Sequence, residues 1–266
     1  MNILITGHDT FHNRGCQALV YTTTAILRSA FPDAVFTVLS WDPEYDEPRM
    51  RADHPEIPVR FIRHRFQVGE FSRRNRLWMT LYRAGLRTDR ILWTQAALYG
   101  AIKSADLVVV SGGDILGDYG DEAIRHYLFP VAVAQTLGKP VYVFAQSISP
   151  HSTEEMRRFV GRHLERAALV TVRERLSYDY VKSLGARVPV RLTADPAFLL
   201  QPSRGERVAA ILKKEGLEGS PRPWIVTGSP RNACSRKMGM TCVRRMPCPK
   251  IVLERMTVIG SLKEWW

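Results

Sequence analysis

The sequence has few cysteines, no long apolar run and no histidine after His163. The four cysteines are unevenly spaced and none forms a Cys-x-x-Cys pair, which excludes a disulfide scaffold and the usual zinc and redox motifs. No segment reaches the roughly 20 apolar residues that cross a bilayer, and the chain does not begin with a basic stretch followed by an apolar run. We therefore expect a cytoplasmic protein with reduced thiols and no bound metal.

The composition is that of an ordinary globular protein. Of the 266 residues, 45% are apolar and 24% are charged, which disfavours disordered and fibrous classes. This length allows one large domain or two modest ones. The formal net charge of +12 suits a polyanion, an anionic membrane face, or phosphorylated and acidic substrates, and it does not choose among them.

Short β-rich runs alternate with helical stretches along most of the chain, and this rhythm predicts an α/β fold with a parallel sheet. Several runs, including residues 108–110, are apolar throughout, as expected for strands covered by helices on both faces. The predicted strands are residues 2–6, 35–40, 59–62, 107–111, 141–145, 169–172, 190–193 and 224–227. The predicted helices are residues 16–29, 89–103, 122–137, 153–167, 176–184 and 204–215.

Residues 42–90 interrupt this rhythm and predict an excursion from the core. Residues 42–48 hold two prolines and several acidic residues, a composition typical of a turn, and many arginines follow. Among these arginines, apolar residues recur at helical spacing, namely Leu77, Trp78, Leu81, Tyr82 and Leu86. A basic amphipathic helix can lie on a membrane surface, but such a stripe more often docks on its own domain, and we favour docking.

A polar loop, residues 7–18, joins the first strand to the first helix. The N-terminus of a helix points free N–H groups at a bound anion, so the loop is a candidate anion site. Its glycine spacing matches neither Gly-x-Gly-x-x-Gly nor Gly-x-x-x-x-Gly-Lys-Ser/Thr, and we predict neither NAD nor ATP. His8 and His12 could flank chemistry here, although an exposed loop histidine is more often inert.

Other predicted strands also end in polar residues. The loop at residues 111–120 contains the pair Gly112–Gly113, which lets backbone approach a ligand or another loop, although tight turns use the same residues. Residues 146–150 follow the next strand, and Arg173 and Glu174 follow the one after it. Ligands of open α/β sheets bind at the carboxyl ends of the strands, so we expect these loops to converge.

Arg173 is the natural candidate for holding a carboxylate or phosphate, because its planar guanidinium offers paired donors. The alternative is an ion pair between Arg173 and an acidic residue at the start of the following helix. Asp195 follows a further strand, and we expect it to cap the next turn.

Taken in order, five short segments resemble the polysaccharide pyruvyl transferase family. They are Asn-Arg-Gly-Cys-Gln-Ala at 13–18, Gly-Gly-Asp-Ile-Leu-Gly-Asp at 112–118, Gln-Ser-Ile-Ser-Pro at 146–150, Arg-Glu-Arg-Leu-Ser at 173–177 and Asp-Pro-Ala-Phe at 195–198. Each motif is loose by itself, and the ordered set is more specific. The resemblance covers about residues 1–230.

The resemblance implies two Rossmann-like halves, similar to GT-B glycosyltransferases, with the active site between them. It also implies transfer of the three-carbon unit of phosphoenolpyruvate to two hydroxyls of a sugar, which gives a pyruvate ketal and phosphate. The acceptor would be a glycan or a lipid-linked precursor in exopolysaccharide biosynthesis. We expect phosphoenolpyruvate as a substrate rather than a cofactor, no nucleic-acid partner, and a possible peripheral association with the inner face of the membrane.

By position in the family motifs, the catalytic candidates are Asp118 and Arg173. The substrate-binding candidates are Asn13, Arg14, Gly15, Gln17, Gly112, Gly113, Asp114, Gln146, Arg173 and Glu174. Arg173 would hold the phosphate or carboxylate of the donor, and Asp114 and Asp118 would accept hydrogen bonds from sugar hydroxyls. The chemistry also needs an acid for the enol carbon and a base for the hydroxyl.

The last residues do not continue the resemblance. After residue 232 the chain shows no helical or strand periodicity, and the basic Arg-x-His type motif of the second family half is absent. Cys234, Cys242 and Cys248 lack a fourth ligand for zinc. We expect a Rossmann-like domain at 1–220 and a poorly ordered remnant of a truncated or frame-shifted second domain at 221–266. The alternatives are a non-catalytic anion- or glycan-binding module and a GT-B-type nucleotide-sugar glycosyltransferase.

Overall fold

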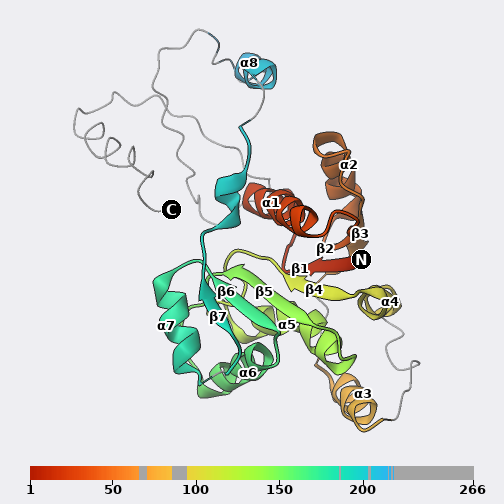
Figure 1. The fold of residues 1–266 in the computed structure, drawn as a ribbon, viewed down its shortest axis with the longest axis vertical. Coiled ribbons are helices and arrows are strands. Elements are labelled where there is room, and N and C mark those ends of the chain that lie inside the picture. Colours follow the sequence, from red (N-terminus) through yellow and green to blue (C-terminus); the bar gives the residue numbers. More distant parts are fainter. Residues whose placement is uncertain are drawn as a thin grey trace, which may run out of the picture. The chain divides into compact units, whose positions relative to one another are not determined.

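A computed structural model describes residues 1–65, 71–85, 95–185, 187–202, 205–214, 216 and 218. Its centre is a parallel sheet of seven strands in the order β3-β2-β1-β4-β5-β6-β7 (Figure 1). The strands are β1 Asn2–Thr6, β2 Val35–Ser40, β3 Val59–Arg63, β4 Leu107–Val110, β5 Val141–Gln146, β6 Leu169–Val172 and β7 Val190–Leu192. The predicted α/β fold is confirmed, and each of these strands lies within one residue of its predicted bounds. The predicted strand at 224–227 falls outside the described residues.

The apolar strands supply two separate cores, one on each face of the sheet. Along β4, Val108 and Val110 enter one core and Val109 enters the other, because successive side chains of a strand point to opposite faces. All three valines are fully buried. Burial on both faces explains why this strand is apolar throughout rather than alternating.

Helices cover the two faces. They are α1 Arg14–Ala30, α2 Pro43–Asp53, α3 Arg73–Arg83, α4 Ala96–Ser104, α5 Asp121–Thr136, α6 Glu154–Glu165 and α7 Arg175–Ser183. The 3-10 helix η2 Pro196–Leu199 and helix α8 Gly205–Lys214 follow β7 in the chain. The core that holds Val109 takes side chains from α1 and α2, and the opposite core takes side chains from α3 to α7. Local signals agree with the predicted boundaries. Thr153 caps α6 by accepting from the Met156 N–H at 3.2 Å, and Gly138 and Gly185 follow α5 and α7 with positive φ.

The turn predicted at residues 42–48 is wrong, because helix α2 covers Pro43–Asp53. Pro43 stands in the first turn, where its missing N–H costs nothing. Pro48 lies inside the helix, but Asp46 and Met50 are almost completely buried, and this packing outweighs the lost hydrogen bond. Helix α2 is therefore the crossover between β2 and β3.

The basic amphipathic stretch forms α3, which docks on the core as we favoured. Trp78 is fully buried and Met79 is nearly so, and α3 packs against α5. Leu77 points outward and is 57% exposed. Within the part of the chain that the structure describes, no helix is long and apolar enough to cross a membrane.

Residues 1–201 form one compact unit, and residues 202–266 form a second. The described part of the second unit consists of Pro202, α8 and two single residues. The predicted remnant at 221–266 and the division near residue 220 therefore stay predictions.

Candidate functional site

The loops after β1 and β4 touch at the carboxyl edge of the sheet. Gly7 has a φ of +98°, which favours glycine, and a Cβ placed on Gly112 would lie only 2.2 Å from the Gly7 carbonyl oxygen. Both glycines are therefore needed for the two backbones to meet. From β1 the chain adds β2 and β3 on one side, and then returns to add β4 to β7 on the other side. The strand order therefore reverses between β1 and β4, and α/β sheets bind ligands at such a switch point.

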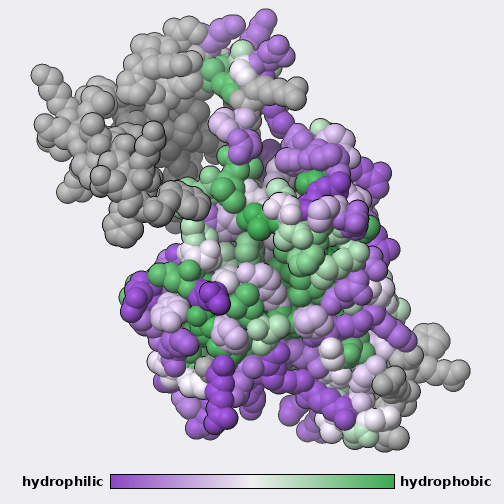
Figure 2. Space-filling model, in the orientation of Figure 1, coloured by the Kyte–Doolittle hydropathy of each residue, from purple (hydrophilic) through white to green (hydrophobic). Residues whose placement is uncertain are grey.

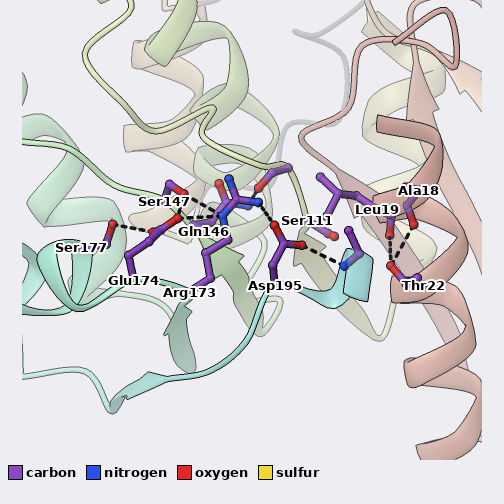
Figure 3. A network of polar contacts seen from close by, with 12 residues as sticks. Ala18, Leu19, Thr22, Ser111, Gln146, Ser147, Arg173, Glu174, Ser177 and Asp195 are labelled. Carbon is purple, nitrogen blue, oxygen red and sulfur yellow. Dashed lines mark hydrogen bonds and ion pairs between the residues drawn. The ribbon is translucent and has the colours of Figure 1, made fainter. Parts of the chain in front are cut away.

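Arg173 joins the ends of four neighbouring strands (Figure 3). Its Nε donates to Ser147 Oγ at 2.7 Å and to Glu174 Oε1 at 3.0 Å, and its Nη1 donates to Asp195 Oδ2 at 2.5 Å. Ser147 N in turn donates to the Gly113 carbonyl at 2.8 Å. The loops after β4, β5 and β6 therefore converge as predicted, and the loop after β7 joins them through Asp195.

The surroundings of Arg173 match the ion-pair alternative. Figure 3 shows its guanidinium between the carboxylates of Glu174 and Asp195, so its charge is already compensated. An anionic ligand would have to displace one carboxylate or bring in another cation, and the role of Arg173 in donor binding stays a prediction. Asp195 also caps η2 as predicted, because its Oδ1 accepts from Ala197 N at 2.9 Å.

Gln146 and Glu174 hold this network in place. The fully buried Gln146 donates through Nε2 to the carbonyls of Val110, at 3.3 Å, and Gly112. Glu174 accepts from Ser147 Oγ at 2.5 Å and from Ser177 Oγ at 3.1 Å. These contacts position the loops, and direct contact of either side chain with a substrate stays a prediction.

The N-terminus of α1 lies at the same edge and has no acidic residue in its first turn. Asn13 Oδ1 accepts from Gly15 N at 2.9 Å, and Arg14 Nη1 donates to Gln17 Oε1 at 2.6 Å. Helices α5 and α6, by contrast, begin with pairs of acidic residues that offset their own dipoles. The positive end of α1 therefore has no acidic side chain of its own and carries the exposed Arg14, while Asn13 caps the Gly15 N–H.

Asp114 and Asp118 lie exposed on the rim of the β4 loop. Asp114 Oδ2 accepts from the hydroxyl of Tyr119, and this hydrogen bond raises the pKa of Tyr119. Asp118 Oδ2 accepts from Ser152 N at 3.1 Å, which links the rim to the start of α6. Both carboxylates reach solvent at the carboxyl edge of the sheet. Their role as acceptors of hydrogen bonds from sugar hydroxyls stays a prediction.

The two loop histidines differ in their surroundings. His12 is exposed, stacks on Tyr45 with 3.6 Å between ring centroids, and places Nε2 at 3.5 Å from Asp42. His8 is 5% exposed, and among the described residues neither of its ring nitrogens has a hydrogen-bond partner. Burial lowers the pKa of His8 to about 3, so the side chain is neutral at physiological pH.

This burial predicts an acid-sensitive fold. Below its ordinary pKa of about 6.5, His8 takes up a proton in the unfolded chain while the folded protein stays neutral, so stability falls as the pH drops from about 6.5 towards 3. At pH 5 the expected loss relative to pH 7.5 is about 2 kcal/mol from His8. Urea unfolding of wild type and His8→Leu at both pH values measures it.

The His8→Leu variant removes the contribution of His8 to the acid sensitivity. The contribution of His163 remains, because burial lowers the pKa of His163 to about 4. We expect the variant to be at least as stable as wild type at pH 7.5, since it deletes two unpartnered polar atoms. Equal acid sensitivity in the two proteins would show that His8 is solvated in the folded state.

Sequence reasoning missed a set of aromatic residues beside the glycine loops. A hollow of about 500 Å³ is lined by Trp41, Tyr119, Gly120, Asp121, Glu122, Ala123, His126 and Tyr127. Trp41 directly follows β2, so it lies at the carboxyl end of a strand, where ligands of α/β sheets bind. Its position in the sequence is therefore the signal that could have identified it.

Tyr127 ties this hollow to the first loop, because its hydroxyl donates to Asp9 Oδ1 at 2.7 Å. Burial, followed by the hydrogen bond to Asp9, raises the pKa of Tyr127 far above its usual range. The phenol therefore remains a neutral donor. Within the described residues, no group of histidine, cysteine and acidic side chains is placed to hold a metal ion.

A family model described as polysaccharide pyruvyl transferase matches residues 13–233, a range that contains the catalytic and substrate-binding candidates from Asn13 to Glu174. No curated protein sequence matches the chain.

Proposed function

The chain belongs to the polysaccharide pyruvyl transferase family, and from this membership we propose that it transfers pyruvate from phosphoenolpyruvate to a sugar of a surface glycan or its precursor. The observation that carries the proposal is the family match over residues 13–233. The convergence of the strand-end loops at one edge of the sheet supports it, because the matched motifs lie in these loops.

The proposed reaction makes two C–O bonds to one carbon. A proton added to the methylene carbon of phosphoenolpyruvate becomes part of a methyl group and leaves the adjacent carbon electron-poor. Two sugar hydroxyls attack this carbon in turn, the C–O bond to phosphate breaks, and the products are a cyclic ketal and inorganic phosphate. One hydroxyl proton balances the proton taken up by carbon, and the other leaves with phosphate.

The N-terminus of α1 is the part of the described site best suited to the anionic donor. Its first turn has no acidic side chain, it carries the exposed cation of Arg14, and a bound anion would replace the Asn13 cap on Gly15 N. Asp114 and Asp118 lie on the neighbouring rim and suit hydroxyl groups rather than phosphate. In this arrangement one of these carboxylates takes the hydroxyl proton as general base.

One observation favours a second candidate, a module that binds ligand without turnover. Arg173 faces two carboxylates, so it offers little uncompensated positive charge to a multiply charged donor, and Arg14 is the remaining cation of the proposed site. Weak donor binding is therefore expected, and turnover would need further cationic groups from residues outside the described ranges. A nucleotide-sugar glycosyltransferase remains the third candidate.

The test is an incubation with phosphoenolpyruvate and a panel of galactose-, glucose- and mannose-containing glycosides. We expect inorganic phosphate release that depends on the acceptor, together with a new methyl singlet of the ketal in the proton NMR spectrum. Donor binding without either product would assign the chain to the binding-module candidate. Release of nucleoside diphosphate from UDP-glucose or GDP-mannose would replace the proposal with a glycosyltransferase.

A further inference from the structure

The hollow at Trp41 is built mainly of aromatic side chains. Trp41, Tyr119, His126 and Tyr127 form its walls, and the start of α5 forms the rest. We call these four residues the aromatic cleft. Its volume of about 500 Å³ lies within the range of small-molecule sites, about 300–1,000 Å³.

The walls of the aromatic cleft are held in place by contacts outside it. The backbone of Trp41 donates to the Asp9 carbonyl at 2.6 Å and accepts from Arg65 Nε at 2.8 Å. His126 is 2% exposed and stacks on His64, with 4.6 Å between ring centroids. Because these anchors come from three different strand ends and from α5, the cleft is preorganised rather than assembled by a ligand.

The charge in the cleft is negative. Asp121 and Glu122 line it and are exposed, and neither carboxylate forms an ion pair or a side-chain hydrogen bond within the described residues. Carboxylates repel phosphate groups and accept hydrogen bonds from hydroxyls. The cleft therefore disfavours phosphoenolpyruvate and nucleotides and suits an uncharged polyhydroxyl compound.

Aromatic walls and free carboxylates together match the surface of a sugar ring. One face of a pyranose presents C–H groups that pack on aromatic rings, while its edge presents hydroxyl donors. Trp41 also lines a second hollow, of about 450 Å³, together with Thr10, His12, Asp42 and Arg65. Two adjoining hollows that share one indole offer room for more than one sugar unit.

The aromatic cleft also adjoins the loops after β1 and β4, which belong to the proposed site. Tyr119, in its wall, donates to Asp114 of the glycine loop, and Tyr127 donates to Asp9 of the first loop. A ligand in the cleft thus lies beside the switch point of the sheet without occupying the N-terminus of α1.

We propose that the aromatic cleft binds the acceptor glycan, with one sugar packed between Trp41 and Tyr127 and a second unit continuing past Trp41 into the adjoining hollow. The term acceptor rests on the proposed function, whereas sugar binding at Trp41 does not depend on it. Asp121 and Glu122 accept hydrogen bonds from the ring hydroxyls. The specificity is for an uncharged saccharide of at least two units.

Saturation-transfer NMR and calorimetry with methyl β-galactoside, methyl β-glucoside, lactose and cellobiose test the proposal. We expect at least one disaccharide to bind more tightly than its monosaccharide. Trp41→Ala is expected to weaken that binding about tenfold or more, the equivalent of losing one aromatic stacking contact. Tyr119→Ala, which removes a side chain that is 66% exposed, should weaken it without disturbing the fold.

Phe31→Ala is the matched control. Phe31 is also a partly exposed aromatic residue, but it ends α1 at the opposite edge of the sheet. We expect this variant to bind saccharides as wild type does. Equal weakening in Phe31→Ala and Trp41→Ala would overturn the proposal, as would saccharide binding that neither Trp41→Ala nor Tyr119→Ala changes.

A parallel titration with phosphoenolpyruvate separates this inference from the proposed function. Saccharide binding that depends on Trp41, without donor binding or ketal formation, would uphold the cleft and reject the transferase. Donor binding without saccharide binding by wild type would reject the cleft and leave the transferase standing. UDP-glucose binding that depends on Trp41 and exceeds that of every plain saccharide would also reject the cleft as an acceptor site.

Discussion

Replacing Gly112 with alanine is expected to lower the free energy of unfolding by about 3 kcal/mol. The new Cβ would lie 2.2 Å from the Gly7 carbonyl oxygen and 2.9 Å from Ile115 Cγ2. The first of these neighbours is backbone and cannot rotate away, and Gly7 is itself fixed by its positive φ. The loops after β1 and β4 must therefore separate, and ligand binding at this edge should be lost along with stability.

The matched control for this variant is Gly100→Ala. Gly100 lies inside α4, and a Cβ there would meet no atom within 4 Å. Alanine is the better helix former, so this variant should be as stable as wild type or more stable by up to about 1 kcal/mol. Urea denaturation measures both. Coincident unfolding curves for Gly112→Ala and wild type would show that the two loops do not touch.

Arg173→Ala is expected to cost about 2 kcal/mol of stability and to weaken donor binding, because the strand-end loops lose the side chain that joins them. The substitution leaves Glu174 and Asp195 without their shared cation, and the Arg173 side chain is only 18% exposed. Breaking a fully buried pair costs about 3–5 kcal/mol, and the partial exposure of Asp195 reduces this value. Chemical denaturation and calorimetry with phosphoenolpyruvate measure the two effects.

Two further variants separate a structural role of Arg173 from donor binding. Asp195→Asn removes one negative charge beside the guanidinium, so phosphoenolpyruvate should bind severalfold more tightly if Arg173 contacts it. Unchanged affinity in Asp195→Asn, together with reduced stability, would limit Arg173 to holding the loops. Arg175→Ala serves as control, because Arg175 is 74% exposed and its pair with Asp179 is worth only about 0.3–0.5 kcal/mol.

Much of the sheet could be predicted because its strands are buried on both faces. An apolar run such as Val108–Val110 is a strong local signal, and the parallel arrangement then brings all carboxyl ends to one edge. The convergence of Gly113, Ser147 and Arg173 followed from these two facts. The segments that resemble the family lie at these strand ends, so the fold and the family resemblance point to the same edge of the sheet.

The parts that could not be predicted depend on tertiary packing. Helix α2 forms despite Pro48 because Asp46 is buried and accepts hydrogen bonds from Ser40 Oγ, Thr10 Oγ1 and Phe11 N. No local pattern shows these long-range contacts. The sequence also left open whether Arg173 would face a ligand or an acid, because that choice depends on where β7 places Asp195.

The aromatic cleft is a second feature of this kind. Trp41 and Tyr127 are far apart in the sequence and line one hollow only because β2 and β4 flank β1. Neither residue belongs to a periodic pattern that marks a site. Only the strand order shows that the residue after β2 lies beside the start of α5.

The most direct test of the account is to locate phosphoenolpyruvate on the ¹⁵N-labelled protein by NMR. We predict that the amides of Gly15, Gly113 and Ser147, at the carboxyl edge of the sheet, shift on titration. Those of Gly138 and Gly185, which end helices at the opposite edge, should stay unchanged. Shifts confined to Gly138 and Gly185, or none at any of the five amides at millimolar donor, would contradict the assignment of the strand-end loops as the substrate site.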